Sequence, residues 1–422
     1  MSNTKPTGEI TGKISAKSNL ISFGSGCAVI SWETNDTAGV EIRVSTQPGD
    51  EKLVNKSKER SGQTEIPWLV DSTIYDFRLY AASQPEKPID SVKVRRDFDS
   101  VPIVLRELAE EALRGNIDMA ELSQFIATVT PRCLHSGKFH EIFPVWERHG
   151  FHVTPVHFYQ PIPDTQSLPE SLWNRPSELV GIDMNDAMQL DLLRNHFPKF
   201  RHEYEQFPTE PTGERGRFYF NNGLFDGTDA LVAYCMIRHF QPRLIIEVGS
   251  GFSSLVAAEA IARNENSALI CIEPFPLDFL RQGFPGLHSL IEKKVEDIDL
   301  EFFSQLDSGD ILFIDSSHTV KIGGDVNFLF LEVLPRLKPG VLVHFHDIFL
   351  PFDYRRDWVM DELRFWTEQY LLQAFLSFNS EFEVLMANSY LAHRYMEDFK
   401  AAFSNSPSWG GGSFWMRRKG RH

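Results

Sequence analysis

Residues 242–262 read PRLIIEVGSGFSSLVAAEAIA, and this stretch decides the fold of the second half of the chain. Its apolar run at 244–248 is typical of a buried parallel strand. Gly249 and Gly251 follow at once, and a helix-forming sequence begins after them. Glycines at such a turn let the backbone approach a ligand closely, and the helix N-terminus adds free N–H groups and positive potential. The stretch therefore predicts a strand, a ligand-binding turn and a helix.

Short strands and helices alternate from residue 218 onward. This alternation predicts an α/β fold with a doubly wound, mostly parallel Rossmann-like sheet that helices cover on both faces. Further strands are expected in 268–276, at the start of 288–303, at 311–314 and at 341–345, with a helix capped by Asp325 before the last. Because ligands bind beyond the carboxyl ends of such strands, Asp315, His318, His346 and Asp347 should converge beside a cofactor.

The glycine turn alone does not identify the cofactor. A dinucleotide-binding turn reads GxGxxG, and Ser254 stands where the third glycine would be. Glu273, at the tip of the next strand, could accept hydrogen bonds from both hydroxyls of a ribose, a role shared with dinucleotide enzymes. A side chain at Gly249 is expected to fill space that the ligand needs. An NAD-dependent oxidoreductase is therefore one alternative.

The motif ExGxGxS, which begins at Glu247, is similar to the first motif of class I S-adenosylmethionine-dependent methyltransferases. With FIDSSH and VHFHDIF, residues 218–390 resemble a broad group related to the catechol and macrolide-sugar O-methyltransferases. The resemblance implies S-adenosylmethionine as cofactor, with Glu247 near its cationic methionine end and Glu296 beside the adenine. The cofactor-binding residues that it implies are Glu247, Gly249, Ser250, Gly251, Ser253, Glu273, Glu296 and Asp315.

The same resemblance implies a reaction site. Catechol-type enzymes hold Mg²⁺ with an Asp after the fourth strand and an Asp with a polar neighbour after the fifth, which here are Asp315, Asp347 and His346. A basic residue three places after the first Asp is their general base, and His318 stands at this position in place of Lys. A histidine with its ordinary pKa of about 6.5 is suited to accept a proton, with Asp315 or Asp347 orienting the ring. Because Mg²⁺ prefers oxygen ligands to imidazole, it stays open whether Mg²⁺, another divalent metal or no metal is used.

Three regions follow from the patterns along the chain. Residues 1–97 alternate with a period of two, as in CAVISWET (27–34), which predicts an all-β sandwich. Leu69, Thr73, Tyr75 and an early Trp32 resemble the pattern of fibronectin type III modules. Residues 98–207 are predicted to be a helical and Pro/aromatic-rich connecting or lid region, with a helix near 100–127. Residues 208–422 are the predicted methyltransferase domain, and the aromatic segments 158–173 and 218–225 are expected to cover the acceptor or cofactor.

The amino-acid composition limits the kinds of partner that this chain is expected to bind. The 422 residues carry a net charge of −16, so the chain lacks the basic footprint of a nucleic-acid or anionic-membrane binder. Four scattered cysteines and an N-terminus without the apolar segment of a signal peptide favour the cytoplasm. The expected acceptor is a hydroxyl-bearing small molecule or saccharide. A non-catalytic carbohydrate-binding protein with a relic cofactor fold is the second alternative, and homo-oligomer formation is left open.

Overall fold

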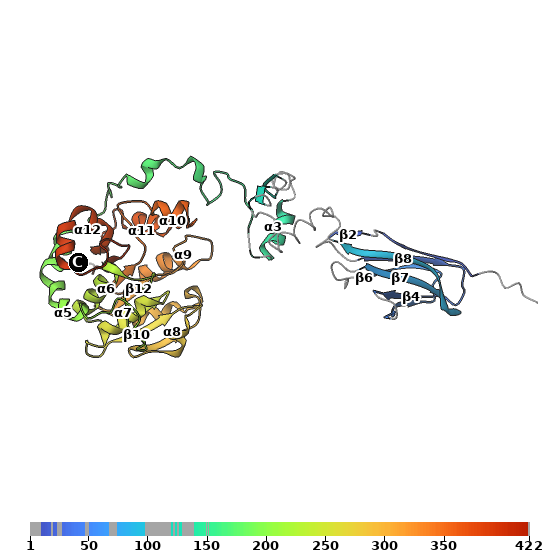
Figure 1. Ribbon diagram of the computed structural model, residues 1–422, viewed down its shortest axis with the longest axis horizontal. Helices are drawn as coiled ribbons and strands as arrows, with labels where there is room; N and C mark the ends of the chain where they lie inside the picture. The colour runs from blue at the N-terminus through green and yellow to red at the C-terminus, as the bar shows by residue number, and fades with distance from the viewer. Residues whose placement is uncertain are drawn as a thin grey trace, which may run out of the picture. The chain divides into compact units, whose positions relative to one another are not determined.

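The computed structural model of the chain divides into two compact units, Met1–Pro155 and Val156–His422. It describes residues 10–17, 20–22, 28–46, 50–66, 74–97, 139–148, 150 and 152–420, together with 120, 123–124 and 126–128. Figure 1 labels their helices and strands.

The described part of the N-terminal unit is built mainly from two β-sheets. One sheet has the order β1-β3-β6 and the other the order β2-β8-β7-β4-β5. Their bounds are β1 Gly12–Ala16, β2 Leu20–Ser22, β3 Ala28–Thr34, β4 Val40–Ser45, β5 Lys52–Ser57, β6 Ser61–Ile66, β7 Ile74–Ala81 and β8 Gln84–Asp97. Alternate side chains of both sheets, such as Trp32 of β3 and Phe77 of β7, share one buried cluster. The predicted all-β character of this region is therefore confirmed.

Two predictions for the first unit fall largely outside the described residues. Leu69 and Thr73 of the fibronectin-like pattern are not described, so that resemblance stays a prediction. The helix expected near 100–127 is described at only a few positions. The unit also contains helix α3, Phe139–Arg148.

The second unit contains the α/β sheet. Its strands are β9 Leu244–Val248, β10 Ala268–Ile272, β11 Leu287–Ile291, β12 Ile311–Ile314, β13 Leu342–Phe345, β14 Phe382–Ala387 and β15 Phe414–Arg418. Its α-helices are α4 Asp186–Asp191, α5 Arg201–Tyr204, α6 Gly227–Phe240, α7 Phe252–Ile261, α8 Asp278–Gln282, α9 Asp325–Phe328, α10 Arg356–Met360, α11 Glu368–Leu376, α12 Asn388–Arg394 and α13 Met396–Ala402. Shorter 3-10 and π-helical turns lie at Thr165–Ser167, Glu170–Asn174, Leu192–His196, Phe197–Phe200, Val295–Asp297, Leu300–Gln305, Leu329–Val333 and Leu334–Arg336.

The sheet is doubly wound, as the alternation predicts. Its strand order is β11-β10-β9-β12-β13-β15-β14, and the first five strands of this order are parallel. The strand β15 runs antiparallel to both of its neighbours in this sheet, β13 and β14. The order reverses between β9 and β12, so the connections after these two strands diverge and leave a crevice at their carboxyl ends. The turn after β9 and the segment after β12 therefore share the place where such folds bind ligands.

Helices cover both faces of this sheet because its strands are apolar on both sides. Ile245 and Phe313 point into one buried cluster with helices α6 and α7. Ile246 and Leu312 point into a second cluster with the helical segment after β12 and with α11. Such two-sided burial explains why β9 reads as a continuous apolar run instead of an alternating one.

The segment between β12 and β13 agrees with its predicted helix but not with its predicted cap. Helical structure runs from Asp325 to Arg336. Gly324 occupies the cap position, and the Asp325 carboxylate instead accepts hydrogen bonds from the Ser317 backbone N–H at 2.8 Å and its hydroxyl at 2.6 Å. Asp325 thus ties the loop that follows β12 to the helix. Among the helices of the described residues, none has the length and apolarity needed to cross a membrane.

Candidate active site

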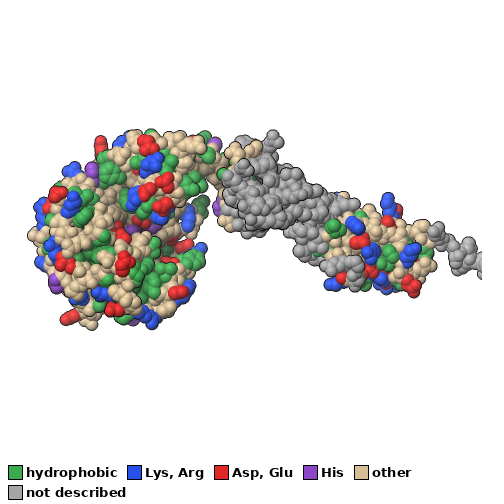
Figure 2. All heavy atoms as spheres, in the orientation of Figure 1, with side chains coloured by type: hydrophobic (Ala, Val, Ile, Leu, Met, Phe, Trp, Pro, Cys, Tyr) green, Lys and Arg blue, Asp and Glu red, His purple; other side chains and the backbone are tan. Residues whose placement is uncertain are grey.

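A cavity of about 710 Å³ opens beyond the carboxyl ends of β9, β12 and β13. Its lining comes from the glycine turn, the start of α6, the strand ends, segment 349–366 and loop 408–412. Figure 2 shows this unit hollowed on one face, with acidic, basic and histidine side chains gathered at the hollow. The volume lies within the roughly 300–1,000 Å³ usual for small-molecule sites. Of the predicted site residues, Gly249, Ser250, Gly251, Ser253, Glu273, Asp315, His346 and Asp347 line it.

The two glycines of the turn serve different purposes. Gly249 has a φ of +78°, and a Cβ there would collide with the backbone carbonyl of Asp315. The structure thus gives this glycine a second reason, because a side chain would strike the neighbouring strand end, while the expected clash with the ligand stays a prediction. Gly251 has no protein atom within 4 Å of the position that a Cβ would take. Open space at Gly251, which lines the cavity, is what a close-fitting ligand requires.

Two glutamates lie on opposite sides of this turn. Glu273 lines the cavity, and its carboxylate accepts hydrogen bonds from the backbone N–H of Ser250 at 3.2 Å and of Phe275 at 2.8 Å. Glu247 is buried beneath the turn, where it accepts hydrogen bonds from the hydroxyls of Ser253 at 2.6 Å and Ser254 at 2.5 Å. Burial raises the pKa of Glu247 to about 7, although these hydrogen bonds oppose the shift. Glu247 thus stabilises the turn through these buried hydrogen bonds and does not line the cavity.

Glu296 is also outside the lining of this cavity. It lies in the 3-10 turn Val295–Asp297, which follows the third strand of the predicted order, β11. Its predicted contact with adenine stays a prediction.

Carboxylates and imidazoles converge at the ends of β12 and β13. His318 Nε2 lies 3.3 Å from Asp315 Oδ1 and 3.5 Å from Asp347 Oδ2. His346 Nδ1 lies 3.2 Å from Asp347 Oδ1 and 3.8 Å from Asp315 Oδ1. Ligand atoms of Asp315, His318 and Asp347 all lie within 4.8 Å of one another, a spacing at which three side chains could hold one metal ion. The expected convergence of these four residues is therefore observed.

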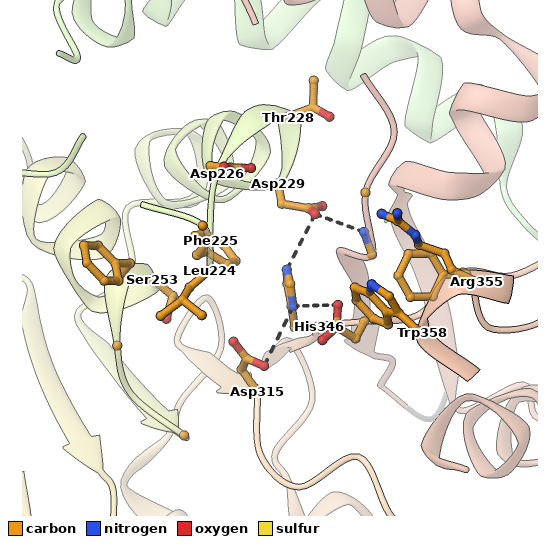
Figure 3. Close-up of a pocket in the computed structure, with 18 of the residues that line it drawn as sticks. Leu224, Phe225, Asp226, Thr228, Asp229, Ser253, Asp315, His346, Arg355 and Trp358 are labelled. Atoms are coloured by element: carbon orange, nitrogen blue, oxygen red, sulfur yellow. Dashed lines mark hydrogen bonds and ion pairs between the residues drawn. The ribbon is translucent and has the colours of Figure 1, made fainter. Parts of the chain in front are cut away.

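Each imidazole also faces a third carboxylate that sequence reasoning missed. His318 Nδ1 lies 2.9 Å from Oε2 of Glu368, the first residue of α11. His346 Nε2 lies 3.5 Å from Oδ2 of Asp229 in α6, and Figure 3 shows this imidazole between Asp229 and Asp315. A signal was present for Asp229, because it stands in the apolar stretch GTDALVAYCMI, where a buried carboxylate needs a partner.

These contacts set the charges of the site. Burial alone would lower the pKa of His318, but hydrogen bonds with Asp315 and Glu368 raise it to about 10. Burial would likewise raise the pKa of Asp315, and the nearby His346 and His318 hold it at about 2. The expectation that His318 titrates near its ordinary pKa of about 6.5 is therefore corrected, whereas its role as general base stays a prediction.

The backbone is strained at two of these residues. His318 and Asp347 both have a φ of +56°, a left-handed conformation that costs non-glycine residues roughly 1–2 kcal/mol. The carbonyl of His318 is held by the backbone N–H groups of Thr367 at 2.9 Å and Glu368 at 3.0 Å. Beside Asp347, a Cβ on Gly412 would lie 2.6 Å from the Asp347 Cα, so only glycine fits there. Strain of this kind persists where surrounding contacts fix a functional geometry.

A wall of tryptophans and arginines forms another part of the cavity, and sequence reasoning missed it as well. Arg364 places its guanidinium 4.7 Å from the ring centre of Trp358 and 5.1 Å from that of Trp366. The Trp366 ring lies 4.4 Å from that of His318. Arg355 and Trp358 lie on the side of the cavity across from Leu224 and Phe225 in Figure 3. The signal was the run WVMDELRFW (358–366), which is rich in aromatic and charged residues.

Comparisons with known proteins agree with this geometry. Residues 246–348, from β9 to just beyond β13, match a family model described as a methyltransferase domain. An uncharacterized protein of Archaeoglobus fulgidus is 36% identical over 165 residues, which are 36% of this chain and 73% of that protein.

Two solved structures are similar in a more distant way. One is the O-methyltransferase TomG from Streptomyces achromogenes in complex with SAM, at 13% identity and a TM-score of 0.29, covering 57% of this chain and 92% of that one. The other is an O-methyltransferase from Bacillus cereus in complex with SAH, at 13% identity and a TM-score of 0.30, covering 46% and 81%. Scores this low add nothing to the assignment.

The archaeal protein shares a family with this chain, and the methyltransferase-domain match spans the glycine turn and both acidic strand ends of a doubly wound sheet. The chain therefore carries a methyltransferase domain, with residues 246–348 as its matched part, and is an S-adenosylmethionine-dependent methyltransferase.

Proposed function

We propose that this methyltransferase transfers its methyl group to a hydroxyl of a sugar or of a glycosylated or secondary metabolite. One observation carries the proposal: a single cavity joins the glycine turn to the carboxylate–imidazole cluster and to the tryptophan–arginine wall. A cofactor and an acceptor bound in this cavity would meet beside Asp315.

The cofactor end of the cavity suits S-adenosylmethionine. Gly249, Ser250, Gly251 and Ser253 form the turn that would cradle it, with open space at Gly251. Glu273 accepts two backbone hydrogen bonds, and a carboxylate has further lone pairs for the two hydroxyls of a ribose. Asp315, at the end of β12, would lie between the cofactor and the acceptor.

The acceptor end suits a ring that carries hydroxyl groups. Trp358 and Trp366 offer apolar faces on which a ring can stack, and Arg355 and Arg364 offer donors that hold polar groups in a fixed plane. Small-molecule sites commonly combine aromatic walls with a few directed polar groups. The saccharide acceptor rests on this chemistry and on the resemblance to sugar O-methyltransferases.

The reaction needs alignment and removal of one proton. The acceptor oxygen forms a bond to the methyl carbon as the carbon–sulfur bond breaks, and the hydroxyl proton leaves. That proton passes to the carboxylate–imidazole cluster at the strand ends, in which Asp315 Oδ1 faces both His318 and His346. The donor atoms of Asp315, His318 and Asp347 fit a divalent cation, which when bound would lower the pKa of the hydroxyl.

The site fits the two alternatives, an NAD-dependent oxidoreductase and a relic carbohydrate-binding protein, less well. In a dinucleotide turn the third glycine permits close packing of helix on strand, whereas Ser254 here donates a hydrogen bond to the buried Glu247. A relic carbohydrate-binding protein would have no need of the strained, charged cluster beside the turn. Both considerations favour methyl transfer.

Calorimetry and turnover test the proposal together. S-adenosylhomocysteine should bind and NAD⁺ should not, and labelled S-adenosylmethionine should methylate hydroxyl groups in a panel of saccharides and glycosides. His318→Ala should lower kcat roughly 10²–10⁴-fold while S-adenosylhomocysteine affinity changes little. Binding of NAD⁺ alone would support the oxidoreductase, and binding of saccharide without either cofactor would support the relic protein.

A further inference from the structure

The carboxylate pair of the active site is faced by two buried imidazoles. His318 and His346 are 5% and 6% exposed, and each has one ring nitrogen within 3.2–3.8 Å of oxygens of both Asp315 and Asp347. Oxygen atoms of Asp315 and Asp347 and an imidazole nitrogen of His318 therefore lie within 4.8 Å of one another, and the imidazole of His346 lies beside them. The catechol-type resemblance implies Mg²⁺ at these same positions, but Mg²⁺ takes oxygen ligands and keeps several waters, whereas two of the side chains here are imidazoles.

Each imidazole has a buried carboxylate on its far side. Glu368, 1% exposed, holds His318 Nδ1 at 2.9 Å. Asp229 faces His346 Nε2 at 3.5 Å, and its carboxylate accepts the backbone N–H of Gly412 at 3.0 Å and of Ser413 at 2.8 Å. Metal-binding histidines usually donate their second N–H to a carboxylate in this manner, which fixes the tautomer and aims the free nitrogen at the ion.

We propose that this site binds a transition-metal ion of the Mn²⁺, Fe²⁺ or Co²⁺ class in preference to Mg²⁺, with Asp315, Asp347 and His318 as ligands and His346 as a further imidazole donor. Imidazole suits these ions, whereas an all-oxygen set suits Mg²⁺. The left-handed backbone at His318 and Asp347 supports this proposal. It directs one donor from each of two strand ends toward the same point, although the conformation is strained. In this arrangement Glu368 and Asp229 are positioning residues. The role of the ion in methyl transfer rests on the proposed function, whereas the binding of the ion does not.

Direct metal binding tests the inference without turnover. The full chain is stripped with a chelator and titrated with Co²⁺, followed by calorimetry and by the visible absorption that imidazole-bound Co²⁺ produces. One Co²⁺ per chain should bind, and Mg²⁺ should compete roughly tenfold or more weakly. If Mg²⁺ binds as tightly as Co²⁺, or if Co²⁺ does not bind, the inference is overturned.

Variants show which side chains hold the ion. His318→Ala and His346→Ala should each change the Co²⁺ spectrum and weaken binding, and Glu368→Gln should weaken it about 10–100-fold while the spectrum still reports imidazole. The matched control is His202→Ala, whose side chain is 74% exposed in α5. S-adenosylhomocysteine affinity, measured on every variant, shows that the fold is intact, and His318→Gln replaces His318→Ala if that affinity is lost.

The outcomes separate this inference from the proposed function. A wild-type Co²⁺ spectrum in both histidine variants would overturn the inference while leaving methyl transfer untouched. Failure of S-adenosylhomocysteine to bind the wild type would overturn the proposed function while the Co²⁺ titration still decides the metal.

Discussion

Two glycines, two residues apart in the same turn, should respond to substitution in opposite ways. At Gly249 an alanine must adopt a φ near +78°, and its Cβ must displace the Asp315 carbonyl. The left-handed backbone costs about 1–2 kcal/mol, and overpacking against the adjacent strand end costs about 1–3 kcal/mol more. Gly249→Ala should therefore destabilise the second unit by about 2–5 kcal/mol, which for a unit of this size is a fall in Tm of roughly 4–10 °C.

At Gly251 the added Cβ meets no protein atom within 4 Å. Gly251→Ala should leave the Tm of the ligand-free protein near the wild-type value. If the cofactor occupies this open space, the methyl group costs about 1–3 kcal/mol of binding free energy, which is roughly a 5- to 150-fold rise in Kd for S-adenosylhomocysteine.

Scanning calorimetry with and without S-adenosylhomocysteine provides the assay, because the ligand shifts the transition of the unit that binds it. Titration calorimetry then gives the Kd of each variant. A Gly249→Ala protein that melts within about 1 °C of the wild type would refute the close approach of the turn to β12. A Gly251→Ala protein with unchanged Kd would remove the cofactor from the turn.

Four further experiments concern the cofactor end and the rest of the chain. Glu273→Ala should raise the Kd for S-adenosylhomocysteine roughly 10- to 150-fold by removing charge-assisted hydrogen bonds, and Glu296→Gln, measured by the same titration, decides whether the cofactor reaches beyond the cavity to the 3-10 turn. Deleting residues 1–97 should leave that Kd nearly unchanged, and a folded, soluble truncation that no longer binds would contradict the predicted boundary. Hydrogen exchange in 158–173 and 218–225 should slow when S-adenosylhomocysteine and acceptor are added together, and unchanged exchange in both segments would argue against a lid.

The elements of the fold followed from local patterns in the sequence. An apolar run such as 244–248 has few ways to be buried other than as a strand inside a two-faced sheet, and the turn residues around it fix where it ends. Because parallel strands end at one edge, the order of Asp315, His318, His346 and Asp347 along the chain was enough to predict that they meet.

The partners behind these residues were decided only by tertiary structure. Glu368 lies 50 positions after His318, and Asp229 belongs to a helix before β9, so no periodicity links either to its histidine. Their contacts depend on how loops return over the sheet edge, and the pKa of His318 depends on those contacts. The same holds for Gly249, whose neighbour is the carbonyl of Asp315 on another strand. Local sequence determines which backbone conformation a segment prefers, whereas the charges and close approaches at a site arise from segments that packing brings together across the whole unit.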